Sequence, residues 1–276
     1  MSAPSRQKAM MLPVLSRPDT VLRLARTWAA LLALATLPAI ALAQEAQPLT
    51  IEADNSIEWN QTDGIYTATG NAVAAQGDRR ISGNELVATY DPDSETRDIE
   101  KITATGAVNF VDTDVDASGG RIIYMIKERD YQVDGPKARV KGSRGTITAN
   151  TRIILDTRPD DSQEMKATGD ALYRDADDRI FAGDRLDAIF DEAGSLVSID
   201  AKGDVRVVTE GGREATGDAA VYDAVTEQAT LTGNVVVIDG ESRMQGARAE
   251  VDFKTGNSRM LSAGSGGRVT GVLVSN

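Results

Sequence analysis

A short phrase centred on one glycine recurs along this chain about every 33 residues, and this spacing constrains the fold more than any other feature. In each copy, small residues flank the glycine, and apolar and polar residues alternate on both sides of it. Alternation with a period of two indicates β-strands, because successive side chains of a strand point to opposite faces. The five clearest copies lie at residues 68–73, 104–108, 167–171, 201–205 and 231–235.

Each repeat contains two strands. A second small residue follows the marker glycine after 13 or 14 positions, as Gly119 follows Gly106, and it begins another alternation. Turn-forming sequences such as 62–64 separate the strands. The third repeat is the weakest, since Pro136 interrupts its first strand and Ala149 replaces the glycine of its second, as a bulge would cause. We therefore predict an all-β protein of about 12–16 strands.

The alternation leaves one face of the strands apolar and the other largely polar. Sequential hairpins of this kind must bury the apolar face, and two antiparallel sheets folded over each other satisfy that requirement. The marker glycines, such as Gly106, fall on the apolar face in the middle of their strands. Glycine at such a position marks either a bend or a close approach. Here we interpret it as clearance along the wall of an interior groove.

The first 43 residues differ from everything that follows. They carry five basic residues and one acidic residue, and then an apolar run of 16 residues that ends at Ala43. A basic start, a short apolar core and a small-residue end are typical of a cleaved signal peptide. We expect a signal peptide over residues 1–43, cleavage between Ala43 and Gln44, and a mature chain over 44–276. The alternative is an uncleaved anchor helix, which needs about 20 apolar residues.

Residues 158–162 form the most loop-like stretch, near the middle of the mature chain. They are either a boundary between two modules, at about 49–157 and 163–274, or a long hairpin loop. The sequence leaves both interpretations open.

Charge argues against nucleic acid as a partner. Cleavage at Ala43 removes five of 30 basic and one of 42 acidic residues, which leaves 25 basic and 41 acidic residues and a net charge of −16. A chain this acidic is repelled by bare nucleic acid and by anionic membrane surfaces. We therefore expect no nucleic-acid partner.

The composition also disfavours an enzyme. The chain has no histidine and no cysteine, which excludes the usual nucleophile–base pairs and ordinary zinc sites. Residues 112–116 resemble the start of a calcium loop, but Ala117 stands where glycine is needed and Ile123 where the glutamate ligand belongs. We interpret this segment as a solvated turn, and we expect neither a cofactor nor catalysis.

The paired half-motifs resemble a known family. Residues 68–73 with 81–86, and 231–235 with 244–249, are similar to the OstA/LptA family of periplasmic lipopolysaccharide-transport proteins. The resemblance covers nearly all of 49–274. It implies a long, slightly twisted β-jellyroll, open along one side, with an apolar groove that shelters the acyl chains of lipid A. This chain is longer than the short bridge protein of the family, so its place in the bridge and its oligomeric state stay open.

The resemblance further implies a periplasmic protein that bridges the inner and outer membranes during lipopolysaccharide export and outer-membrane assembly. Its partners would be lipopolysaccharide and the β-jellyroll domains of the inner-membrane and outer-membrane components of the same system. Copies of the fold stack edge to edge in this family, and this implies self-association. The terminal segments 49–53 and 269–274 would lie at the two ends of such a stack, where unpaired backbone groups invite strand addition.

The apolar columns of the repeats are the candidate binding site. They form either a closed, dry core or the wall of a lipid groove, and their many alanines and glycines, which leave volume unfilled, together with the resemblance favour the groove. The residues expected to line it are Ile102, Val108, Phe110, Ile122, Tyr124, Leu186, Phe190, Val205, Val207, Leu231, Val235 and Phe253.

Three alternatives compete with lipid transport. The first is a β scaffold that stacks but has a filled interior and carries no lipid. The second, which follows if the N-terminal segment is not cleaved, is an inner-membrane-anchored component of the same export system. The third is a β-solenoid enzyme acting on polysaccharide, which would need two carboxylates facing each other across a cleft.

Overall fold

The computed structural model describes residues 47–264 and 267–274, and the expected signal peptide with its junction between Ala43 and Gln44 lies outside them. The described residues form strands and turns, which confirms the all-β prediction. Over these same residues, no helix has the length and apolar character that crossing a membrane requires.

Eighteen strands are present in the described part of the chain. Those of the first half are β1 (Thr50–Glu52), β2 (Ser56–Asn60), β3 (Ile65–Gln76), β4 (Arg79–Tyr90), β5 (Ile99–Asp112), β6 (Val115–Met125), β7 (Asp130–Asp134), β8 (Ala138–Gly142), β9 (Gly145–Ala149) and β10 (Arg152–Thr157). Those of the second half are β11 (Gln163–Asp175), β12 (Ile180–Phe190), β13 (Leu196–Val208), β14 (Glu214–Asp223), β15 (Gln228–Asp239), β16 (Ser242–Asp252), β17 (Ser258–Leu261) and β18 (Thr270–Val272).

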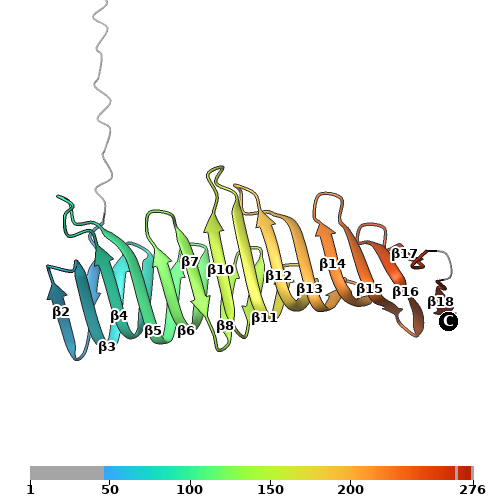
Figure 1. The fold of residues 1–276 in the computed structure, drawn as a ribbon, viewed down its shortest axis with the longest axis horizontal. Helices are drawn as coiled ribbons and strands as arrows, with labels where there is room; N and C mark the ends of the chain where they lie inside the picture. Colours follow the sequence, from blue (N-terminus) through green and yellow to red (C-terminus); the bar gives the residue numbers. More distant parts are fainter. Residues whose placement is uncertain (1–46, 265–266, 275–276) are drawn as a thin grey trace, which may run out of the picture. The chain divides into compact units, whose positions relative to one another are not determined.

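The strands form one antiparallel sheet that folds over itself into two layers (Figure 1). In β6, residues 115–118 pair with β8 and residues 121–125 pair with β7, so one strand contributes to both layers. We call layer A the half that contains β2, β7, β10 and β17, and layer B the half that contains β1, β8, β9 and β18. Every strand of eight residues or more runs through both layers.

Each long strand bends from one layer into the other at its small residues. In β5, Gly106 and Ala107 have φ values of 77° and 52°, and the pairing register shifts at the same place. Two consecutive residues with positive φ make a bulge that bends the strand. The same pattern recurs at Gly70–Asn71, Gly169–Asp170, Gly203–Asp204 and Gly233–Asn234.

The marker glycines do not face the interior. A Cβ atom built on Gly106 would lie 2.6 Å from Nδ2 of Asn84 on the neighbouring strand. The interpretation of these glycines as clearance along a groove wall is therefore wrong. The alternative, that each glycine marks a bend in its strand, is correct. The bulges place the corner on one side of the molecule, so the hairpin turns of both layers lie along the opposite, open side.

The third repeat departs from the others. Its first long strand is divided into β7 and β8 at Gly135–Pro136, and its second into β9 and β10 at 150–151. Proline cannot donate to the ladder, which explains the first break. Where a bulge was expected at Ala149, the strand is interrupted at residues 150–151, although the backbone N–H groups of Asn150 and Thr151 still donate to Gly169 and Thr168 of β11. These breaks and the short edge strands raise the count to 18, above the predicted 12–16.

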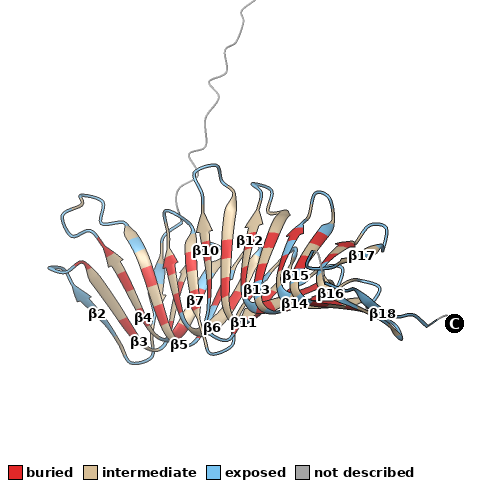
Figure 2. Ribbon diagram, turned by 45° about the vertical axis from the view of Figure 1, so that its right-hand side comes forward, coloured by how far each residue is buried: buried red, intermediate tan, exposed pale blue. Residues whose placement is uncertain are grey.

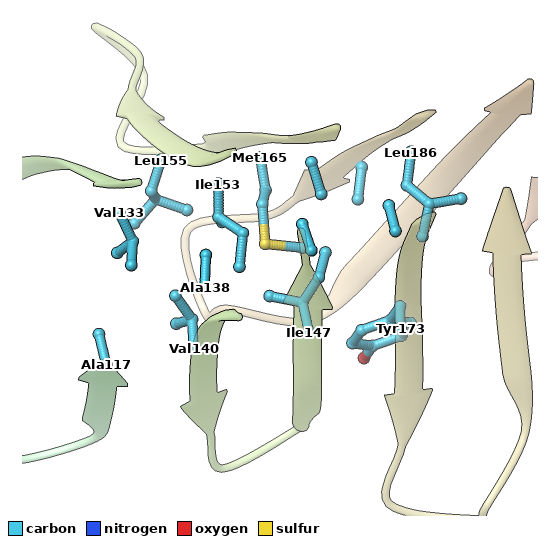
Figure 3. Close-up of a cluster of buried hydrophobic side chains, with 14 of the residues drawn as sticks. Ala117, Val133, Ala138, Val140, Ile147, Ile153, Leu155, Met165, Tyr173 and Leu186 are labelled. Atoms are coloured by element: carbon cyan, nitrogen blue, oxygen red, sulfur yellow. The ribbon is translucent and has the colours of Figure 1, made fainter. Parts of the chain in front are cut away.

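The inner faces of the two layers pack against each other. Figure 2 shows the buried residues as bands that cross successive strands, as the alternation predicted. Aromatic rings join the layers: Phe110 of layer B lies 5.3 Å from Tyr124 of layer A, and Phe181 lies 4.7 Å from Tyr222, measured between ring centroids. In Figure 3, Met165 of layer A lies opposite layer B side chains in the middle of this core.

Candidate functional site

All twelve residues expected to line a groove lie in the interior between the layers, or at its margin. Ten of them are buried, and Phe190 and Phe253 are half-buried. The buried ones pack closely on small partners; Leu231, for example, pairs with Ala220 and Ala249 across its two neighbouring strands. The deep interior is thus filled by side chains, and unfilled volume lies nearer the open side.

The open side of the interior is edged by a row of layer B residues at the ends of the strands. They are separated from the core residues of their strands by an even number of positions, so they lie on the same inner face, which is turned toward layer A. We call these residues the mouth row. They are Gln76, Arg79, Asp112, Val115, Gly142, Gly145, Asp175, Arg179, Arg213, Asp239 and Ser242.

Ion pairs fill much of the mouth row. Arg79 Nε lies 2.7 Å from Asp112, and Arg179 Nε lies 2.5 Å from Asp175. A third pair repeats the arrangement near the C-terminal end, where Arg213 Nη2 lies 2.7 Å from Asp239. Arginine suits this role because its planar guanidinium can bind a carboxylate and still donate to a second group.

The same arginines also reach across the opening to layer A. The Arg79 guanidinium lies 5.3 Å from the centroid of the Tyr124 ring. Arg179 Nη1 donates to the hydroxyl of Tyr222 at 3.4 Å, and Arg213 donates to the backbone carbonyl of Gly256. The mouth is therefore bridged at three places along its length.

The pKa values of the mouth groups follow from these contacts. Burial alone would raise the pKa of Asp112, but hydrogen bonds from Arg79 and Thr113 and the charge of Arg79 hold it below its usual range. Burial raises the pKa of Tyr173 to about 12, with a further contribution from nearby Asp175. Asp112 therefore stays ionised and Tyr173 stays protonated around neutral pH.

One large apolar cavity opens in the third repeat. It has a volume of about 400 Å³ and lies between the β8–β9 hairpin of layer B and the β10–β12 part of layer A. By contrast, the space near Arg79 and Tyr124 measures only about 20 Å³. The apolar residues that line the large cavity are Val115, Tyr131, Val140, Ile147, Leu155, Met165, Tyr173, Phe190 and Ala193.

Of the twelve predicted residues, only Phe190 lines this cavity. Ile102, Phe110 and Tyr124 line the small space, and Phe253 lines another, more polar cavity of about 420 Å³. Sequence reasoning missed the other lining residues because the third repeat fits the pattern poorly. The signal that could have revealed the cavity is a pair of glycines, Gly142 and Gly145, where the other repeats carry larger side chains.

Residues 113–114, at the centre of the segment 112–116, form the hairpin turn between β5 and β6, and the flanking residues belong to the two strands. The carboxylate of Asp112 binds Arg79, and that of Asp116 lies 3.4 Å from Arg139. Among the described residues, no group of three or more acidic side chains is arranged to hold a metal ion.

Comparison with known proteins places this architecture in context. The family model described as "LptA/(LptD N-terminal domain) LPS transport protein" matches the chain twice, at residues 50–161 and 157–257. A search of curated proteins returned no match. A solved structure, LptH from Pseudomonas aeruginosa, is described as the LptA homologous periplasmic component of the conserved lipopolysaccharide transport device. It is 14% identical, with 83% of this chain and 96% of that chain covered; at its TM-score of 0.21 the likeness has no bearing on the fold.

Proposed function

This chain belongs to the LptA and LptD N-terminal domain family of lipopolysaccharide transport proteins, and on that premise we propose that it shields lipopolysaccharide acyl chains in transit through the periplasm. The observation that carries the proposal is the cavity of about 400 Å³ between the layers, lined mainly by apolar side chains. Burying acyl chains there contributes about 0.8 kcal/mol per CH₂ group. No step of chemistry is needed for this role.

The twelve interior residues of the sequence prediction form the wider apolar surface available to the cargo. Ten are buried against each other, so acyl chains would occupy them only if the layers separate. The bridged mouth resists such separation through arginines of layer B, such as Arg179, that bind groups of layer A. We propose that cargo first uses the existing cavity and reaches the rest of the interior as the layers part.

We also propose that the chain joins other β-jellyroll domains, including copies of itself, through its terminal strands. At the N-terminal end, Ile57 and Trp59 of β2 are on the core-facing side, yet they are 51% and 47% exposed because no further strand of the described residues covers them. At the C-terminal end, Val272 of β18 is 65% exposed. An added strand at either end would cover apolar side chains and pair free backbone groups. Such a chain of domains would bridge the inner-membrane and outer-membrane components of lipopolysaccharide export.

One further candidate function is supported by a specific observation. The filled deep interior, with residues such as Leu231 fully buried, fits a stacking scaffold that carries no lipid. The position of the chain in the export system depends on its N-terminal segment, and sequencing the N-terminus of the mature protein distinguishes a periplasmic form from an inner-membrane-anchored one.

A photo-crosslinking amino acid at Phe190 tests lipid transport directly. Phe190 lines the cavity, whereas Val221, on the outer face of layer A and 53% exposed, provides the matched control position. In cells that make lipopolysaccharide, transport predicts adducts with lipopolysaccharide at Phe190 and none at Val221. A scaffold predicts no adduct at either position, and that result would overturn the proposal.

A further inference from the structure

The mouth row has a gap at its two glycines, and this gap lies directly over the apolar cavity. Gly142 and Gly145 are paired with each other in the β8–β9 hairpin, and their neighbours in the row are Val115 on one side and Asp175 on the other. Elsewhere in the row, arginines and aspartates occupy the opening and bridge it. The missing side chain of Gly142 therefore leaves the interior accessible from the side at this point, whereas backbone atoms of Arg174 and Asp175 in β11 already fill the Cβ position of Gly145.

The gap results from the sequence and not from a local opening of the layers. A Cβ atom on Gly142 would have only the backbone oxygen of Asp114 within 4 Å, at 3.7 Å, which is ordinary contact. A side chain at this position would thus extend into the cavity without displacing the backbone. The absence of that side chain keeps the cavity open.

The lining of the cavity selects the chemical class of its occupant. Aliphatic and aromatic side chains such as Val140, Ile147 and Met165 predominate in its lining, and the polar side chains are those of Gln163 and of the turn residues Asp114, Ser143, Arg144 and Glu192. Most of a ligand's surface would therefore meet apolar groups, which disfavours a wholly polar ligand. Its volume of about 400 Å³ is within the range of roughly 300–1,000 Å³ that is usual for small-molecule pockets. An unbranched hydrocarbon chain fits both constraints.

The rim adds a single cation. Arg144, in the turn between β8 and β9, is exposed, and no carboxylate of the described residues lies within ion-pair distance of its guanidinium. The two acidic residues that line the same cavity, Asp114 and Glu192, belong to the separate turns β5–β6 and β12–β13. Arg144 is thus the one basic residue lining this cavity, and its charge is available to a ligand.

We propose that the Gly142–Gly145 gap is a lateral access site, which admits one acyl chain of an anionic lipid into the cavity while Arg144 binds the head group. The site rests on the proposed lipid transport and adds to it a defined point of exchange in the middle of the molecule. Cargo would then enter or leave at the third repeat as well as pass along the interior. Arginine bridges at Arg79, Arg179 and Arg213 span the opening at three other points, and the second cavity, of about 420 Å³, is lined by Arg179 and Arg213 and is more polar.

Binding of single-chain amphiphiles tests the site. The probes are dodecyl phosphate and the uncharged dodecyl maltoside, both below their micelle concentrations, with affinity measured by titration calorimetry. Gly142→Leu fills the cavity and should weaken binding of both probes about tenfold or more, because apolar burial is lost. Gly211→Leu is the matched control, since Gly211 lies on another open-side turn and a Cβ atom added there would have no atom within 4 Å. It should bind both probes like the wild type.

The role of the head group is tested separately. Arg144→Gln should weaken dodecyl phosphate binding about fivefold and change dodecyl maltoside binding less than about twofold, because only the charge-assisted contact is removed. Lys141→Gln, on the outer face of the same hairpin, should change neither. Equal weakening of both probes by Arg144→Gln would overturn the assignment of Arg144.

The outcomes separate this site from the wider function. Wild-type affinity in Gly142→Leu, with an unchanged unfolding midpoint, would overturn the lateral site even if lipopolysaccharide adducts form at Phe190. Absence of amphiphile binding by the wild type, with adducts still present at Phe190, would do the same. Absence of both amphiphile binding and adducts would remove the transport function together with the site.

Discussion

Arg79 Nε donates a hydrogen bond to the carboxylate of Asp112 at 2.7 Å, which joins β4 to β5 at the mouth of the interior. Both side chains are less than one-third exposed, and the guanidinium also covers the Tyr124 ring. The contact therefore closes the opening above the N-terminal repeats, where only about 20 Å³ of free space remains. The electrostatic contribution of this contact to folding stability can be measured from the pH dependence of unfolding.

Asp112→Asn should reduce the acid sensitivity of folding. The pKa of Asp112 is lowered in the folded protein, so the unfolded chain binds its proton more readily. The stability from this group is present above the unfolded value of about 4 and is lost as pH falls through the folded value. We expect the free energy of unfolding of the wild type to exceed that of Asp112→Asn by about 0.5–1 kcal/mol at pH 7. This difference should disappear near pH 2. Urea unfolding at both pH values measures it, and a difference that persists at pH 2 would contradict the electrostatic origin.

Gly106→Ala should destabilise the fold by about 1–3 kcal/mol, because alanine at φ of 77° is strained and its Cβ would meet Asn84. Gly194→Ala is the matched control: φ is 72° there, but no atom lies within 4 Å of the added Cβ. It should show the backbone cost alone, about 1 kcal/mol. The double variant Gly106→Ala/Asn84→Ala should recover part of the loss in urea unfolding. If the double variant is no more stable than Gly106→Ala, the contact between the added Cβ atom and the Asn84 side chain does not contribute to the loss.

Leu231→Ala tests whether the deep interior is packed as in an ordinary core. Leu231 is fully buried against alanines of both neighbouring strands, so its truncation should cost about 2–5 kcal/mol. Val221→Ala, on the exposed face of the adjacent strand, should cost less than about 0.5 kcal/mol. Denaturant unfolding compares the two. Similar small losses at both positions would show that the interior around Leu231 is loosely filled, and would favour a groove that extends beyond the third repeat.

The sequence predicts well which strand residues face the interior, because the alternation of side chains depends only on neighbouring residues. Parity alone assigns Tyr124 and Phe110 to the interior, and their rings do meet across the layers. The groove-wall interpretation of Gly106 is wrong because parity assigns a face but does not report φ. Only the structure shows that a bulge turns the strand at this residue.

The access site illustrates what periodicity cannot reveal. Whether Gly142 leaves a gap depends on which inner positions lie at the mouth, and this follows from the fold of the sheet and not from the spacing of residues. The ion pair of Arg79 with Asp112 joins residues 33 positions apart, so no local pattern indicates it. Both features require the pairing register of strands that the repeats leave unspecified.

Val272→Pro should leave the monomer folded and reduce self-association. Val272 lies on β18, a three-residue edge strand of layer B, and pairs with Arg243 of β16. Proline removes a backbone donor and hinders addition of a further strand at this edge. Val272→Ala is the control, because it removes the exposed side chain but keeps the donor. If edge pairing drives assembly, sedimentation over a concentration series should show fewer oligomers for Val272→Pro than for Val272→Ala, with equal circular dichroism spectra. Equal oligomer populations would place the contact elsewhere, and the exposed Ile57 and Trp59 at the other end would then be the surface to vary.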